Sequence, residues 1–224
     1  MGHNLLGILV TFAFVFIVLV LSAIAGKKVD NEVSRKIVHI GVANCWWISM
    51  YFFDSPVSAS IPPVFFIFFN FFSARHNIVK SMERGQEKGG AGYGTVYYPV
   101  SLLVLSVLCF SGLAPLYIGA VAVSCMGYGD GFAALIGRKF GKHKVNLKTG
   151  AQKSVEGCAT MFVISFASST AILSYENIAN AIIISFLIAL FGTFTELFTP
   201  DGYDNLTVPL GIAFFTMILM GVMS

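Results

Sequence analysis

Charged residues are scarce in this chain of 224 residues: acidic and basic side chains together make up 11% of it, whereas hydrophobic residues make up 56%. A soluble domain of this length cannot hide so much apolar surface, because a small domain buries only part of its area. The scarcity of charge therefore excludes an ordinary soluble protein and indicates an integral membrane protein.

Other absences exclude further classes. The run Phe65–Phe69 has none of the alternation of apolar and polar residues that a transmembrane β-barrel requires. No Lys or Arg precedes the first apolar run, so its charge order is not that of a cleaved secretory signal. The four cysteines form no Cys-x-x-Cys pair, which favours the interpretation that they are small residues within apolar segments. No internal repeat is visible, so the sequence gives no support to an inverted-repeat transporter.

Eight apolar stretches are separated by polar or Gly/Pro-rich breaks. A spanning helix needs roughly 17–25 residues, so some stretches are long enough outright and others predict short or tilted helices. We expect an all-α, polytopic membrane helix bundle with about eight transmembrane segments, because backbone in lipid must satisfy its own hydrogen bonds. Residues 1–224 form one integral membrane domain, with an N-terminal anchor helix over 1–26. The stretches cover approximately 5–25, 37–53, 59–74, 95–110, 113–127, 155–174, 177–198 and 206–222.

The distribution of basic residues orients the predicted bundle. All fourteen Lys and Arg residues fall in the loops after the first, third and fifth stretches. Cytoplasmic loops carry an excess of Lys and Arg, so these three loops and the loop 199–205 are predicted to be cytoplasmic. Both termini are then extracytoplasmic, in a multi-pass protein of the cell membrane whose active site faces the cytoplasm.

The stretch 126–141 is rich in glycine and has one carboxylate. Gly127, Gly129 and Gly131 alternate where one apolar helix is expected to end and a short second one to begin. Asp130 is placed to cap the second helix, and free N–H groups at a helix start suit an anion. The carboxylate then suggests a metal ion shared with that anion. A plain helix break with a capping Asp is the alternative.

The following loop is cationic and ends in Lys153, Ser154 and Glu156. It lacks the glycines of a Walker A loop, which excludes that motif. Its cations are suited to a polyphosphate, and Glu156 to a metal ion. Contact with anionic lipid explains the basic residues equally well, although it leaves Glu156 unexplained.

Two regions near the predicted cytoplasmic edge add further polar candidates. Burying ionised Glu196 in a membrane helix costs roughly 2.5–3.5 kcal/mol, so it needs a partner, either a metal ion or Lys153. Asp204 follows in the next loop as a metal ligand or a base, or as a simple helix cap. Arg35 and His39 are four residues apart and share a helix face. They are suited to phosphate or substrate, or His39 is a core histidine.

These residues occur in an order that resembles the polyprenol kinase family, which includes phytol kinase, dolichol kinase and the CTP-dependent diacylglycerol kinase of yeast. The resemblance is nearest to the phytol kinase branch and covers roughly residues 33–215. The stretches that carry it are Arg35–Lys36–x–x–His39, Gly129–Asp130–Gly131–Phe132–Ala133 with Gly137–Arg138, Lys153–Ser154–x–Glu156–Gly157, Glu196, and Asp204–Asn205–Leu206–Thr207–Val208–Pro209.

The resemblance implies a membrane kinase that transfers the γ-phosphate of CTP, with Mg²⁺ or another divalent cation, to a lipid alcohol. Phytol, a polyprenol or dolichol, and diacylglycerol are the candidate alcohols. The expected catalytic residues are Asp130, Asp204, Glu196 and Lys153. The expected nucleotide-binding residues are Gly129, Gly131, Arg138, Lys139, Ser154 and Asn205. The expected metal ligands are Asp130, Asp204 and Glu156, with phosphate or substrate contacts from Arg35 and His39.

Two features depart from the family pattern. Tyr203 stands where many members have a second acidic residue, and Asp201 is the candidate replacement. A phosphatidate cytidylyltransferase is the alternative function, although its terminal signature is absent here. A small ion-coupled transporter is the alternative from another class, and it predicts carboxylates nearer the bilayer midplane. Membrane lipids are expected partners, nucleic acid is not, and a homo-oligomer is left open.

Overall fold

A computed structural model describes residues 2–76, 94–146, 152–200 and 202–223. Lys80, Arg84, Lys88, Lys148 and Asp201 lie outside the described residues. The elements are α1 (Gly2–Ala25), α2 (Asn31–Ala43), α3 (Cys45–Phe52), α4 (Pro56–His76), α5 (Gly94–Phe110), α6 (Leu116–Ser124), the π-helix η3 (Cys125–Asp130), α7 (Gly131–Phe140), β1 (Lys144–Asn146), β2 (Gln152–Ser154), α8 (Val155–Tyr175), α9 (Ala181–Phe198) and α10 (Asp204–Met223).

The all-α membrane class is confirmed by the length and apolar character of these helices. Within the described part of the chain, six helical runs are long and apolar enough to cross a membrane, and Gly94–Phe110 is a shorter apolar helix. Each predicted apolar stretch lies on a helical segment, although the second is divided at Asn44 into α2 and α3. The total of eight crossings and the orientation of the termini stay predictions.

The predicted helix start at Asp130 is wrong. Residues Leu116–Phe140 form one helical run in which η3 joins α6 to α7. Asp130 has helical backbone angles, φ −65° and ψ −38°, and its side chain caps no N–H group. The wider π-helical turn accommodates the glycines without ending the helix, and such turns are frequent at functional sites.

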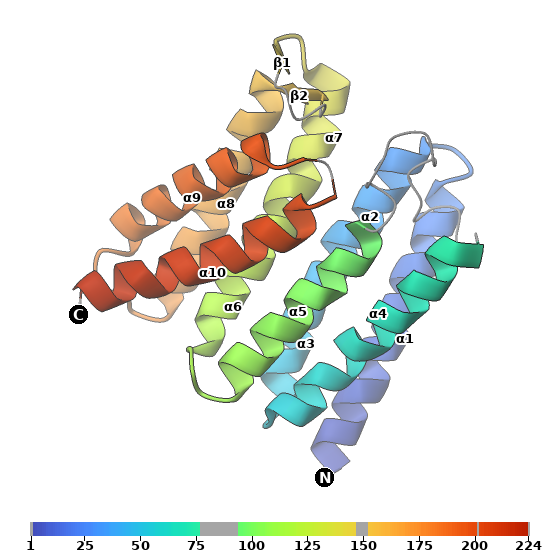
Figure 1. The fold of residues 1–224 in the computed structure, drawn as a ribbon, viewed down its shortest axis with the longest axis vertical. Helices are drawn as coiled ribbons and strands as arrows, with labels where there is room; N and C mark the ends of the chain where they lie inside the picture. The colour runs from blue at the N-terminus through green and yellow to red at the C-terminus, as the bar shows by residue number, and fades with distance from the viewer. Residues whose placement is uncertain (1, 77–93, 147–151, 201, 224) are drawn as a thin grey trace.

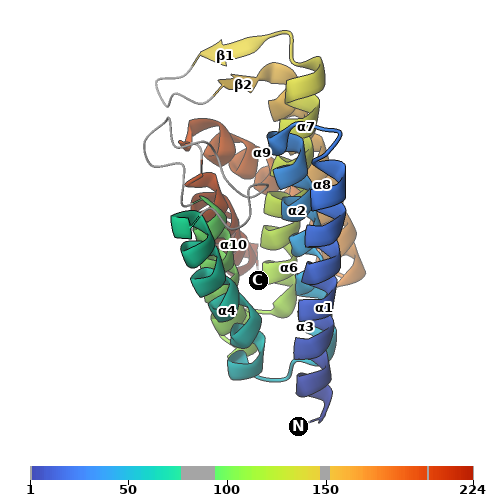
Figure 2. The same ribbon diagram turned by 90° about the vertical axis from the view of Figure 1, so that its right-hand side faces the viewer.

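The helices form two groups that meet along one seam (Figures 1 and 2). In the first group α4 packs on α5, and α1 packs on α2 and α3. In the second group α8 packs on both α7 and α9, and α10 packs on α9. The groups are joined by contacts of α10 with α5 and of α2 with α7 and η3. Residues from both groups can therefore meet at the seam.

The alternating glycines of η3 and α7 allow close helix packing. A Cβ atom on Gly127 would lie 2.2 Å from Ala43 Cβ, and one on Gly131 would lie 2.4 Å from Ile40 Cγ1. Small residues let helix backbones approach in a membrane, where packing contributes most of the association energy. The expectation that Gly129 and Gly131 offer free N–H groups at a helix start is therefore wrong, because the helix does not start there.

A short hairpin interrupts the helical pattern between α7 and α8. Strand β1 pairs antiparallel with β2, so that Lys144 lies opposite Ser154 and Val145 opposite Lys153. Ser154 ends the hairpin and caps α8, because its hydroxyl accepts from the N–H of Gly157 at 3.1 Å. The hairpin and the cap together fix the backbone that carries Lys153.

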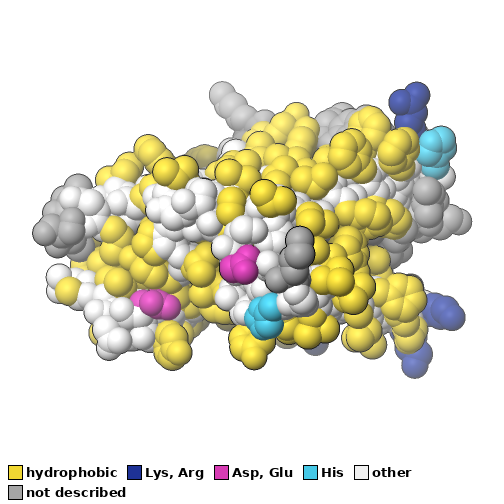
Figure 3. All heavy atoms as spheres, turned by 90° about the horizontal axis from the view of Figure 1, so that it is seen from below, with side chains coloured by type: hydrophobic (Ala, Val, Ile, Leu, Met, Phe, Trp, Pro, Cys, Tyr) yellow, Lys and Arg dark blue, Asp and Glu magenta, His cyan; other side chains and the backbone are white. Residues whose placement is uncertain are grey.

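The two ends of the molecule differ in charge. The end that carries the N-terminus shows mostly apolar and uncharged surface with scattered acidic side chains, and basic side chains only at its margin (Figure 3). At this end Asn4 donates to Asp54 at 2.7 Å. The opposite end carries the close of α1, α4 and α7 and the hairpin, where the basic loops begin (Figure 1).

Candidate active site

Asp130 is the most enclosed carboxylate of the candidate site. It closes η3, is 3% exposed, and forms an ion pair and hydrogen bond with Lys36, which is itself 4% exposed. A buried ion pair costs desolvation, and breaking it by removing one partner is strongly destabilising. The pair also joins α2 to η3 across the seam.

His39 stands one helical turn after Lys36, so both side chains reach the same carboxylate. The Nε2 atom of His39 lies 3.4 Å from Asp130 Oδ2 and 3.2 Å from the backbone oxygen of Met126. Its ring stacks on Tyr98 of α5 with centroids 4.5 Å apart. These contacts hold the imidazole between the two groups of helices.

Arg35 lies on the same helix and pairs with Glu32, with Nε donating to Oε2 at 3.1 Å. Arg35 and His39 line one cavity, which confirms that they share a helix face. Lys36 and Asn205 also line that cavity. Cationic and amide side chains therefore surround its polar end.

A second ion pair lies within the second group of helices. The Nζ atom of Lys153 donates to the backbone oxygen of Glu196 at 3.1 Å and forms an ion pair with its Oε1. Glu196 lies in the last turns of α9 and is 4% exposed. The expected partner Lys153 is thus the one that the structure provides for this buried carboxylate.

Asp204 and Asn205 begin α10 and are both buried. Asp204 Oδ1 accepts from the N–H of Gly202 at 3.1 Å and from the N–H of Asn205 at 2.9 Å. The Asn205 side chain donates to the backbone oxygen of Gly94 at 2.9 Å. This bond ties the start of α10, which carries Asp204, to the start of α5 across the seam.

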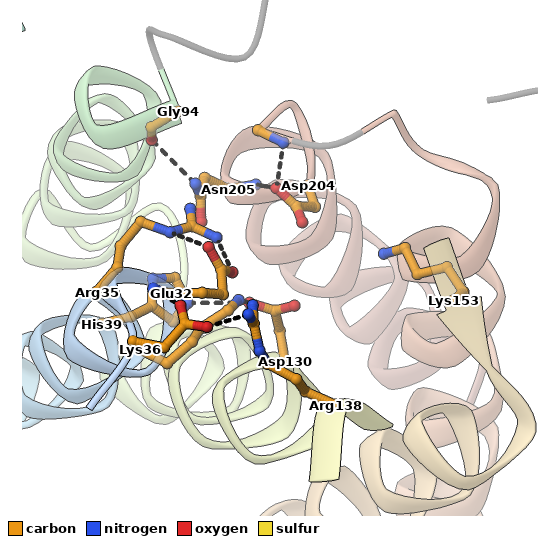
Figure 4. Close-up of polar contacts among 12 residues, drawn as sticks. Glu32, Arg35, Lys36, His39, Gly94, Asp130, Arg138, Lys153, Asp204 and Asn205 are labelled. Atoms are coloured by element: carbon orange, nitrogen blue, oxygen red, sulfur yellow. Dashed lines mark hydrogen bonds and ion pairs between the residues drawn. The ribbon is translucent and has the colours of Figure 1, made fainter. Parts of the chain in front are cut away.

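The two ion pairs share one electrostatic environment. Burial lowers the pKa of Lys153, but the carboxylates of Glu196, Asp204 and Asp130 outweigh it and hold the pKa above its ordinary value. Figure 4 shows Asp204 and Asn205 beside Arg35, with Lys36 and Asp130 below them and Lys153 reaching in from the hairpin. The structure thus brings together residues that the sequence separates by more than a hundred positions.

The donor set suits a metal ion that arrives with phosphates. Among the described residues, no three His, Cys, Asp or Glu side chains form a group that could hold a metal ion alone. Mg²⁺ commonly takes one or two carboxylates, with substrate phosphates and waters completing its octahedron. Asp130 and Asp204 are both buried and both act on the charge of Lys153, so they can supply the one or two carboxylates that such an ion needs.

Other predicted site residues have partners elsewhere. Glu156 accepts from the N–H groups of Lys142 at 3.1 Å and His143 at 3.3 Å, so its contacts hold the turn before the hairpin. Arg138 pairs with Asp30 and is half exposed. Lys139 lies over the ring of Phe140, 5.2 Å from its centroid. The structure does not bring these side chains to the two ion pairs.

The role of Lys36 was not predicted from the sequence, although it belongs to the Arg35–Lys36–x–x–His39 stretch. A lysine at the mouth of a membrane helix requires a carboxylate if it is buried. The position of Lys36 at the start of an apolar stretch therefore indicates that it needs a carboxylate, but it does not identify Asp130 as that carboxylate.

Comparison with known proteins gives one consistent result. The chain is 37% identical to a phytol kinase of Synechocystis sp. over 188 residues, which cover 81% of this chain and 77% of that protein. It is 32% identical over 214 residues to a probable chloroplastic phytol kinase of Triticum aestivum, covering 87% of this chain and 70% of the relative. A probable phytol kinase 1 of Oryza sativa is 30% identical over 219 residues, covering 89% and 68%. No family model matches the chain, and no solved structure matches it either.

Proposed function

The chain belongs to the polyprenol kinase family, in its phytol kinase branch, and from this we propose that it transfers the γ-phosphate of CTP to the hydroxyl of phytol or a closely similar isoprenoid alcohol. It is a lipid-alcohol kinase, a phosphotransferase with a nucleotide phosphate donor and a membrane-embedded helical fold. CTP as that donor and the cytoplasmic face of the active site are parts of the proposal.

One observation carries the proposal most directly. Lys36, which pairs with Asp130, lines the polar end of a cavity whose remaining lining is largely apolar. A lipid alcohol has one hydroxyl on an apolar tail, so this juxtaposition suits its head group. The second pair, Lys153–Glu196, supplies a cation on the opposite side, where a nucleotide would approach from the basic loops.

The transfer step follows from these positions. The alcohol oxygen forms a bond to the γ-phosphorus, the bond from that phosphorus to the bridging β-phosphate oxygen breaks, and CDP leaves. The hydroxyl proton passes to Nδ1 of His39, because Nε2 faces the backbone oxygen of Met126 and so carries the N–H of the neutral ring; Asp130 stabilises the resulting charge from 3.4 Å. Phosphoryl transfer depends mainly on positioning and charge neutralisation, for which Lys153 and Arg35 are suited.

Asp130 and Asp204 are the residues that would hold Mg²⁺, which when bound neutralises phosphate charge. Lys36 positions Asp130, and the N–H groups of Gly202 and Asn205 position Asp204. We leave Glu156 out of this set, because its carboxylate accepts from backbone N–H groups of the preceding turn. Gly129, Arg138 and Lys139 are likewise given no phosphate contact, whereas Asn205 and Ser154 orient neighbouring backbone.

A transfer assay tests the function. Purified protein in nanodiscs is given CTP labelled at the γ-phosphate with phytol, farnesol, a long polyprenol or diacylglycerol, and ATP and UTP replace CTP in parallel. We expect label on phytol with CTP and Mg²⁺. Pyrophosphate release with CDP-lipid from phosphatidate would instead support cytidylyl transfer, and label on diacylglycerol alone would overturn the isoprenoid assignment.

A labelling experiment tests the cytoplasmic face. Lys144 in the hairpin is exposed, whereas Cys45, Cys109 and Cys125 are buried and Cys158 is half-buried. In a Cys158→Ala background, Lys144→Cys is expected to react with an impermeant maleimide only in inside-out vesicles. Reaction of Lys144→Cys in intact cells would reverse the proposed orientation.

A further inference from the structure

An elongated cavity runs between the helices of the first group. Its walls come from α1, α2, α3, α4 and α5, with Asn205 of α10 at one end. Its lining is mostly aliphatic and aromatic between two ends of different character. The wall residues between those ends include Val15, Val42, Trp46, Pro62, Phe66 and Leu102.

The direction of the helices shows which residues lie at each end. Asn70 of α4 donates to the backbone oxygen of Thr95 at 2.7 Å, so the close of α4 meets the start of α5. Ser22 of α1 donates to the backbone oxygen of Ser34 at 2.8 Å, so the close of α1 meets the start of α2. The polar end, with Lys36 and Asn205, lies at these meeting points.

The far end of the cavity is formed by small residues from four helices. From Lys36 to Ser49 the helical rise is about 20 Å, and from Thr95 to Ser106 it is about 16 Å. Thr11, Ser49, Ala59 and Ser106 line the cavity at this distance, and all four are buried.

The hydroxyl groups of Thr11 and Ser49 at the far end are turned towards their own helices. Thr11 donates to the backbone oxygen of Gly7 at 2.8 Å, and Ser49 donates to that of Cys45 at 2.9 Å. Their methyl and methylene groups therefore remain for the cavity surface. The far end is therefore lined by small side chains with mostly apolar surfaces, whereas the near end holds Arg35, Lys36 and His39.

We infer that this cavity holds the isoprenoid tail of the alcohol substrate, and that the small residues at its far end set the longest tail it accepts. The inference rests on the proposed function and names the tail site of the same reaction. A single elongated cavity with one polar end fits one tail and one hydroxyl better than the two tails of diacylglycerol. Side chains larger than those of Ala59 and Ser106 would fill the space that the tail's end occupies.

The test fills the far end with larger side chains and varies the alcohol. In Ala59→Phe and Ser106→Phe, kcat/KM for phytol relative to geraniol is expected to fall by at least about tenfold, because a pocket discriminates strongly against groups it cannot contain. Val57→Phe and Val104→Phe are matched controls on the same helices, since Val57 is 73% exposed and Val104 43% exposed. Both controls are expected to keep the wild-type ratio, and retained geraniol turnover shows that a variant is folded.

A binding measurement on the wild-type protein needs no variant. A phytol analogue with a photoactivatable group at the tail end is expected to label the segments around Ser49, Ala59 and Ser106, and excess phytol is expected to suppress the label. Unchanged phytol-to-geraniol ratios in both enlarged variants, or label only on outward residues such as Phe68, would overturn the inference. Labelling of the far end without any phosphorylated alcohol would instead overturn the proposed function and leave the tail site standing.

Discussion

Helices α6 to α10 and helices α1 to α5 fill their interiors in different ways (Figure 1). In the second group α6 is buried along its length, and Met161, Ile188 and Ile212 are fully enclosed. In the first group the facing side chains leave an elongated cavity. The close-packed group carries Asp130 and the Lys153–Glu196 ion pair, and it therefore supplies a rigid support for charged groups. The hollow group supplies room for an apolar ligand.

The candidate site lies where these groups meet. The hydrogen bonds of Lys36 of α2 with Asp130 of η3 and of Asn205 of α10 with Gly94 of α5 are among the contacts that cross the seam. Catalytic charges must be held within narrow limits, whereas a lipid tail needs space. The contrast therefore predicts that changes on the rigid side act mainly on turnover, and that changes on the hollow side act mainly on which alcohol is used.

Asp130→Asn is expected to have the largest effect, because it removes the charge at the seam itself. Turnover should fall by at least about 10²–10³-fold, as for loss of a central electrostatic group. The buried ammonium of Lys36 would lose its partner, at a cost of about 3–5 kcal/mol. Turnover and thermal unfolding in nanodiscs measure the two effects separately.

The double variant Asp130→Asn with Lys36→Met is the control for stability. It removes both charges and should recover much of the lost thermal stability without recovering turnover. Near wild-type turnover in Asp130→Asn alone would reduce this residue to a structural role and remove the seam from the mechanism.

Lys153→Met tests whether the close-packed group binds the phosphates of the nucleotide. We expect roughly 10²-fold lower kcat/KM for CTP, since one stabilising cation is lost from the phosphate site. Lys142→Met is the matched control, because Lys142 is exposed and lies in the same loop region. Equal and mild effects at both positions would support a basic region that only contacts anionic lipid.

Asp204→Asn should lower turnover by about 10–100-fold if Asp204 is a metal ligand. Higher Mg²⁺ concentrations should then restore part of the rate, and calorimetry should show weaker CTP binding at low Mg²⁺. CTP binding that is unchanged at every Mg²⁺ concentration, with strongly reduced turnover, would make Asp204 the proton acceptor instead.

Gly119→Ala is expected to have the smallest effect, and it acts on the wall between the two groups. A Cβ atom there would lie 2.0 Å from Cζ2 of Trp46, a cavity-lining residue. Overpacking should cost about 1–3 kcal/mol and shift Trp46 into the cavity, which raises KM for phytol with little change in KM for CTP. Gly221→Ala is the control, because its added Cβ would meet no atom within 4 Å. Equal thermal stability of the two variants would show that Trp46 can move away from the added methyl group without a loss of stability.

The helical segments were predictable because they depend on local composition. Long apolar runs identify membrane helices, and the ends of the third, fourth, sixth and seventh predicted stretches lie within a few residues of the helix ends. The continuous helix from Leu116 to Phe140 was not predicted, because glycine and aspartate are locally typical of a helix boundary. Packing of Gly127 and Gly131 against α2 made the continuous helix favourable.

Site residues were predictable as a set and less so by role. The desolvation cost of a buried carboxylate singled out Glu196, whereas the glycine-rich stretch singled out Asp130 and the cationic loop singled out Lys153. The cationic loop also singled out Glu156, whose carboxylate accepts from the backbone N–H groups of Lys142 and His143. A local hydrogen-bonding role and a ligand role use the same residue type, so one sequence does not distinguish them.

The sequence by itself determined the membrane class, the helical segments and the gathering of basic residues in three loops, because each depends on residues close together in the chain. Only the tertiary structure decided that Lys36 pairs with Asp130, that Lys153 pairs with Glu196, and that a cavity lies between α1 and α5. Ion pairs and cavities arise where distant segments pack, and buried charges accept whichever opposite charge that packing brings within reach.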